Sequence, residues 1–160
     1  MADPARINRV IDRLIDLLKE IGGDDTAWRV AFKDVTRFRS GNDFKLPMPR
    51  VLLLPQPAGP ESVVRQMGGT WRESRDITAI VLSTHPTEPQ REVADASADV
   101  RKRIRQLNGT LYDTDGTTLL AFMVGDTGSD LSVDPDLAAA GYGQDLVTIS
   151  VTYDVGADGT

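Results

Sequence analysis

The sequence predicts an α+β fold, in which a mostly antiparallel sheet has two long helices packed on one face. Three observations predict it. Two segments have the apolar periodicity of long helices, and several shorter segments are rich in β-formers. An Asp-Gly pair separates two of the β-rich segments, which is typical of an antiparallel hairpin. Strands and helices do not alternate as a parallel sheet requires, so the helices are expected together on one face.

The first predicted helix covers residues 4–21. Asp3 before Pro4 is a favourable start, and Gly22-Gly23 ends it. Its apolar stripe is broad enough to pack against a sheet or a neighbouring subunit. Residues 28–35 alternate between apolar and polar side chains and predict a strand. Residues 51–54 predict a short buried strand.

The centre of the chain predicts a strand at 76–84 followed by a long helix at 87–107. Thr87 and Gln90 have the spacing of a capping box at the start of that helix. Apolar residues then recur on one helical face, and Asn108-Gly109 is a favourable end. This strand and helix are expected to form the centre of the fold.

The last third predicts a hairpin, a loop and a strand. Residues 110–112 and 117–124 flank the hairpin turn at 113–116. The DTDG sequence there resembles the start of a calcium loop, but the twelfth position holds Val124 where a Glu is needed. Residues 125–144 are expected to be a long, mobile polar loop. The alternating segment 145–155 predicts the final strand, and residues 156–160 are expected to be frayed.

Composition limits the protein class. A chain of 160 residues is expected to form one domain, and it contains no cysteine. No apolar run is long enough to span a membrane. Residues 110–160 contain nine Asp and no Lys or Arg, which argues against tight nucleic-acid binding there. A solvated acidic surface is the simplest interpretation of this segment.

No catalytic or cofactor motif is apparent, so we expect neither an enzyme nor a bound cofactor or metal. His85 is the only histidine, and its position before Pro86 is typical of a solvated turn residue. One histidine without cysteine excludes the usual zinc ligand sets. Phosphate-binding glycine motifs and a Gly-x-Ser-x-Gly elbow are absent from the sequence. A weak cation site among the aspartates of 126–136 is the alternative to simple solvation.

The connection at 36–49 interleaves basic and aromatic residues, which makes it a candidate partner contact. The residues concerned are Arg37, Phe38, Arg39, Phe44 and Lys45. Nucleic-acid contact is one alternative. A loop that folds its aromatic residues onto its own domain is another.

Four segments together resemble the tail terminator (tail-completion) proteins of long-tailed bacteriophages. They are the N-terminal amphipathic helix, PRVLLL at 49–54, the strand and helix at 75–104, and DLVTISVTY at 145–153. The loop 125–144 and the connection 36–49 fall outside the resemblance. It implies a structural virion protein, made in the host bacterial cytoplasm, that forms a hexameric ring at the head-proximal end of the tail tube.

The same resemblance implies the partners. The ring would bind the major tail tube protein, end tube polymerisation and offer a surface to the head-completion or neck protein, with no membrane contact. DNA would cross its lumen without specific binding. Because like charges repel phosphate, we expect some of four aspartates to face the lumen: Asp126, Asp130, Asp134 and Asp136. A head–tail connector or other neck adaptor, or a small ligand-binding domain, are the alternatives.

Overall fold

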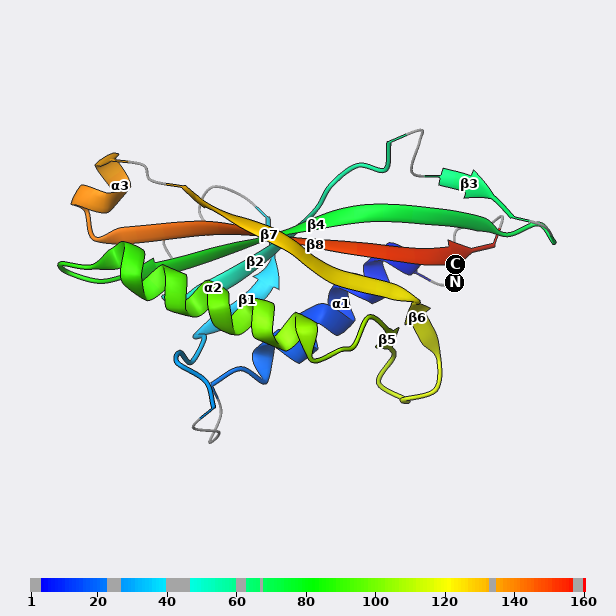
Figure 1. The fold of residues 1–160 in the computed structure, drawn as a ribbon, viewed down its shortest axis with the longest axis horizontal. Helices are drawn as coiled ribbons and strands as arrows, with labels where there is room; N and C mark the ends of the chain where they lie inside the picture. The colour runs from blue at the N-terminus through cyan, green and yellow to red at the C-terminus, as the bar shows by residue number, and fades with distance from the viewer. Residues whose placement is uncertain are drawn as a thin grey trace.

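The computed structural model describes residues 4–22, 27–39, 47–59, 63–66, 68–132, 135–156 and 160. It confirms the predicted α+β fold, with a mostly antiparallel sheet and helices packed against it. The two long strands β4 (Trp71–Thr84) and β8 (Tyr142–Val155) pair along their whole lengths at the centre. They give the molecule its elongated shape (Figure 1).

The main sheet has the order β1-β2-β4-β8-β7, and β3 (Val63–Arg65) pairs with one end of β4. The strand β1 (Asp34–Arg37) runs parallel to β2 (Arg50–Pro55), whereas the other pairs are antiparallel. At the opposite edge lies β7 (Met123–Ser132). The predicted buried strand at 51–54 therefore lies in β2, and the predicted strand at 76–84 is the second part of β4.

Both long helices cover the same face of the sheet (Figure 1). They are α1 (Arg6–Lys19) and α2 (Pro89–Arg105). Their apolar stripes meet the alternate residues of β4 and β8 in one continuous core. Gly143 lies beneath α2, and a Cβ at this position would come within 2.4 Å of the carbonyl oxygen of Pro89. The glycine thus permits a close helix–sheet contact.

The helix ends differ in part from the prediction. The capping box is wrong, since Glu88 is the N-cap of α2 and no side chain of that residue caps the helix. Instead, Nδ1 of His85 accepts hydrogen bonds from the backbone N–H groups of Thr87 and Glu88, at 3.2 and 2.9 Å. The helix α1 begins at Arg6 rather than Pro4, and Asp3 lies outside the described residues. After α2, Asn108 and Gly109 both adopt positive φ, as predicted for its end.

The predicted strand at 28–35 is wrong except for its last two residues, which begin β1. The backbone N–H groups of Arg29 and Val30 donate to the buried carboxylate of Asp99, at 2.6 and 3.0 Å, instead of to a neighbouring strand. Trp28, Val30 and Phe32 do pack against the core, which explains their alternation. The alternation in residues 28–33 therefore predicts which side chains are buried, but it does not predict strand pairing.

The predicted loop at 125–144 is also wrong. It forms most of β7, a short helix α3 (Pro135–Ala139) and the start of β8. Because β7 is an edge strand, it pairs only with β8 in the described sheet. Its side chains can therefore be polar while the strand keeps its backbone pairing with β8. A bulge interrupts the register between Asp126 and Gly128. Residues 157–159, within the end expected to be frayed, lie outside the described residues.

The face of the sheet opposite α1 and α2 is less covered. A small apolar cluster of Leu52, Ile80 and Leu82 lies on it, with Phe38, Met48 and Leu146 packed alongside. Further along the strands this face carries hydroxyl groups, and those of Ser74 and Thr152 lie 3.0 Å apart. No described helix is long and apolar enough to cross a membrane.

Candidate assembly surfaces

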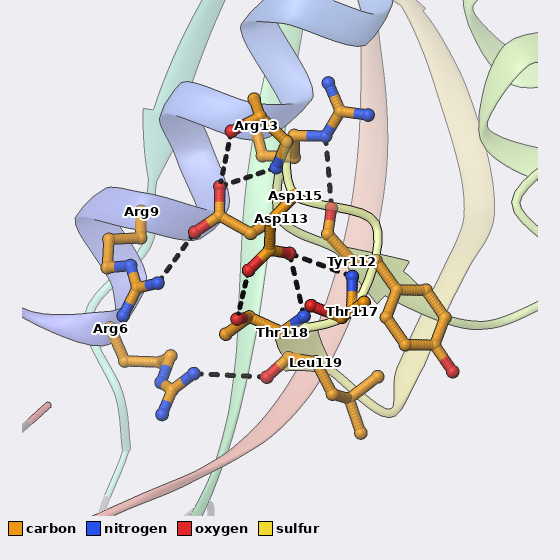
Figure 2. A network of polar contacts seen from close by, with 10 residues as sticks. Arg6, Arg9, Arg13, Tyr112, Asp113, Asp115, Thr117, Thr118 and Leu119 are labelled. Atoms are coloured by element: carbon orange, nitrogen blue, oxygen red, sulfur yellow. Dashed lines mark hydrogen bonds and ion pairs between the residues drawn. The ribbon is translucent and has the colours of Figure 1, made fainter.

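Three arginines on one side of α1 hold the predicted hairpin, formed by β5 (Leu111–Tyr112) and β6 (Leu119–Ala121). Arg6 donates to the carbonyl of Leu119 at 3.1 Å, and Arg13 donates to the carbonyl of Tyr112 at 3.1 Å. Arg9 pairs with the carboxylate of Asp113 at 2.7 Å. Figure 2 shows the three side chains reaching from the helix to the hairpin. We call this set of contacts the arginine clamp.

The turn between β5 and β6 is ordered by its own polar groups. One carboxylate oxygen of Asp115 accepts the N–H groups of Thr117 and Thr118, each at 2.8 Å, and the other accepts the hydroxyl of Thr118 (Figure 2). These bonds, led by the Thr118 hydroxyl, lower the pKa of Asp115. Arg9 and the Thr114 N–H likewise lower the pKa of Asp113. Both aspartates thus favour their charged forms, and Gly116 supplies the positive φ of the turn.

The hairpin presents an exposed apolar pair. Tyr112 and Leu119 are register partners across the two strands, and their exposed fractions are 44% and 42%. Their side chains extend away from α1 (Figure 2). Their own carbonyl groups are the ones that Arg13 and Arg6 hold. The clamp therefore fixes the backbone beneath both residues, and we call this pair the knob.

An apolar hollow of about 200 Å³ lies at the other end of the sheet, next to α3. Leu82, Leu137, Tyr142, Gly143 and Gln144 line it. Leu82 also belongs to the apolar cluster of the open sheet face, so hollow and cluster are continuous. Figure 1 shows α3 and the hairpin toward opposite ends of the long axis.

The predicted partner-contact residues are divided. Arg37 is bound to α1 through the carbonyl and side chain of Asn8 and the carboxylate of Asp12, at 2.7 to 2.8 Å. Phe38 packs against the open-face cluster, which agrees with the alternative that the aromatic residue folds onto its own domain. Arg39 is exposed, whereas Phe44 and Lys45 lie outside the described residues. The structure therefore gives Arg37 an internal role.

The four predicted lumen aspartates are not equivalent. Asp126 is buried beneath α2, with 2% of its side chain exposed, and it pairs with Arg101 at 2.9 Å and with Arg105 at 2.7 Å. Its charge is therefore paired inside the subunit, and a lumen position for some of the other aspartates stays a prediction. Asp130 on β7 and Asp136 on α3 are exposed, and Asp134 lies outside the described residues.

The described residues contain no group of three or more His, Cys, Asp or Glu placed to hold a metal ion. A second, shallow and more polar depression lies on the open sheet face. Its lining includes Gln56, Ser74, Asp76, Ser150 and Thr152. Asp76 accepts the hydroxyl of Ser150 there, which is an interaction between neighbouring strands.

No protein-family model matches the chain, and no curated protein matches its sequence.

The sequence pattern did not predict the knob, the hollow or the clamp. The signal for the clamp was the spacing of Arg6, Arg9 and Arg13 by three and four residues, which places them on one side of a helix. Their acceptors lie 99 to 113 residues away in sequence, beyond any local pattern. The hollow depends on α3, which the sequence assigned to a loop.

Proposed function

We propose that the protein is a structural subunit of a ring that ends a bacteriophage tail tube, as the tail terminator resemblance implies. The observation that supports this most is the presence of two exposed apolar features, the knob and the hollow, toward opposite ends of one elongated sheet. Exposed apolar surface of this kind marks contact with other proteins. The partly covered sheet face adds a third surface for such contacts.

In this proposal the ring docks on the major tail tube protein at the head-proximal end, stops further polymerisation and receives the head-completion or neck protein. A subunit with several contact surfaces suits a protein that must touch its own copies, the tube and the neck. DNA crosses the lumen without specific binding, since the chain carries a net charge of −6. The assembled ring belongs to the virion, after synthesis in the host bacterial cytoplasm.

The test combines the solution mass with the end-capping of tubes. Light scattering and negative-stain images of the same fraction should show rings, either alone or on the ends of purified tail tubes. Added protein should also stop the elongation of tube subunits from one end. A protein that forms no ring and leaves tube growth unchanged would contradict the proposal. Binding to the neck but never to the tube would favour the adaptor alternative.

A further inference from the structure

We infer that neighbouring copies join head to tail, with the knob of one copy (Tyr112 and Leu119) seated in the hollow of the next (Leu82, Leu137 and Tyr142). This inference rests on the proposed ring and names the contact that builds it. The occupant of the hollow is thus a second copy of this chain, presented through its β5–β6 hairpin.

The knob is preorganised for such a contact. The hydrogen bonds of Arg6 and Arg13 reach the carbonyls of the two knob residues themselves, and Asp115 orders the turn between them. An exposed aromatic residue on a fixed backbone loses little conformational freedom when it is buried by a partner. Large aromatic residues in such positions are frequent centres of binding energy. The hairpin therefore has the properties of an anchor.

The hollow has the complementary chemistry. Its apolar side chains continue into the cluster of Leu52, Ile80 and Leu82, so a docked leucine and tyrosine ring would bury apolar area on both sides. Nothing in the hollow demands a charged ligand, because two leucines, a tyrosine, a glycine and a glutamine line it. An apolar pair is the occupant that this lining favours.

Two arginines beside the knob and two aspartates near the hollow are opposite in charge, and Asp115 adds one negative charge in the hairpin turn. Arg6 and Arg13 flank the knob, and in the described part of the chain their guanidinium groups bond to carbonyls, which leaves their positive charges uncompensated. Asp136 precedes Leu137 of the hollow, and Asp130 lies across from Leu146 on the adjoining strand. Complementary charge at the rim of a contact steers encounter and fixes orientation. This places Asp130 and Asp136 at the contact between subunits instead of on the lumen wall.

Position on the molecule decides what such a contact builds. Because the knob and the hollow are different surfaces, toward opposite ends of the long axis, the contact is heterologous (Figure 1). Heterologous contacts generate closed rings when the rotation between copies closes. A pairing of identical surfaces would stop at a dimer. The two features are therefore arranged as a ring requires.

Cross-linking tests the contact directly, since the chain has no cysteine of its own. The variant Thr117→Cys with Ala139→Cys places one thiol beside the knob and one beside the hollow, both at exposed positions that leave the apolar residues intact. Assembled protein treated with a short bismaleimide should give a ladder of covalent multimers. The control is Thr117→Cys with Lys19→Cys, whose second thiol lies on the exposed side of α1.

We expect at least a tenfold greater yield of multimers from the first variant than from the control. Adding Leu119→Asp should abolish the ladder, while circular dichroism confirms that the fold is retained. Rings that form without this ladder, or equal ladders in both variants, would overturn the inference and leave the proposed function standing. Protein that neither assembles nor caps tail tubes would overturn both.

Discussion

At the scale of single residues, Asp126 connects the edge strand β7 to α2. Its carboxylate pairs with Arg101 and Arg105 and also accepts the backbone N–H of Gly128 at the bulge, at 3.1 Å. Asp126 lies two residues after the buried Val124, on the face of β7 that α2 covers, and two arginines of the helix and the N–H of Gly128 satisfy its carboxylate. Together with Val124, it ties the polar edge strand to the rest of the fold.

Replacing Asp126 with Ala should lower the free energy of unfolding by about 1–3 kcal/mol, because hydrogen bonds to a charged group are lost and the N–H of Gly128 is left without an acceptor. Both arginines retain access to water, which limits the cost. Urea denaturation followed by tryptophan fluorescence measures the change. The matched control is Asp16→Ala on the exposed side of α1, which should change stability by about 0.5 kcal/mol or less because Asp16 is exposed. Equal losses in the two variants would contradict this account of Asp126.

The single histidine lies in the turn between β4 and α2, as a turn residue was expected to. Its Nδ1 accepts the N–H groups of Thr87 and Glu88, which precede Pro89, the first residue of α2. The imidazole therefore orders the approach to the helix. The usual helix caps are Ser, Thr, Asp and Asn, but the N-cap residue here is Glu88, and its side chain makes no capping hydrogen bond.

At the scale of elements, the arginine clamp joins the first helix to a hairpin far along the chain. The ion pair of Arg9 and Asp113 is its charged component, with about a third of each side chain exposed. Exposed pairs contribute about 1 kcal/mol or less. The pKa of Asp113 is lowered in the folded protein, so its contribution to stability is present at neutral pH and is lost as the pH falls through the folded-state pKa.

Asp113→Asn should therefore lower the free energy of unfolding by about 1 kcal/mol or less at pH 7. The difference from the wild type should begin to shrink near the unfolded-state pKa of about 3.9 and vanish below the folded-state pKa. Denaturant titrations between pH 7 and pH 2.5 measure it. Asp16→Asn on the exposed side of α1 controls for the loss of one negative charge. A difference that persists unchanged at the lowest pH would show that the Asp113 charge is not its source.

Elements with local signals could be predicted, and elements defined by distant partners could not. The helix α2 and the strands β4 and β8 have clear periodicity along their own sequences, so the sequence located them to within a few residues, except for the first part of β4. The edge strand β7 has no apolar face to reveal it. Residues 28–33 alternate like a strand, yet two of their N–H groups bond to Asp99, about 70 positions away. The candidate contact surfaces were the least predictable features, because the clamp and the hollow both depend on residues that are distant in the sequence.

At the scale of the whole molecule, the fold separates its surfaces. One sheet face is covered by α1 and α2, and the opposite face carries a smaller apolar cluster and is less covered. The N-terminal helix lies against the backbone of the β5–β6 hairpin, and the exposed Asp130 of β7 and Asp136 of α3 lie near the hollow. Every Lys and Arg lies before residue 110, and several of them pair with aspartates of the last third, as Arg9 does with Asp113 and Arg101 with Asp126.

A mixing experiment distinguishes a head-to-tail contact from a symmetric one. Leu119→Asp removes the knob and keeps the hollow, and Leu137→Asp removes the hollow and keeps the knob. Each variant alone should be monomeric, because every contact needs one intact feature of each kind. Equimolar mixtures should form one-to-one dimers and nothing larger, since the second contact of each pair is always broken. Adding Ala139→Cys to the Leu119→Asp variant and Thr117→Cys to the Leu137→Asp variant places one thiol beside each intact feature. The bismaleimide can then trap the dimer, and mass spectrometry identifies it. Homodimers of either variant, or larger assemblies in the mixture, would show that copies meet through other surfaces.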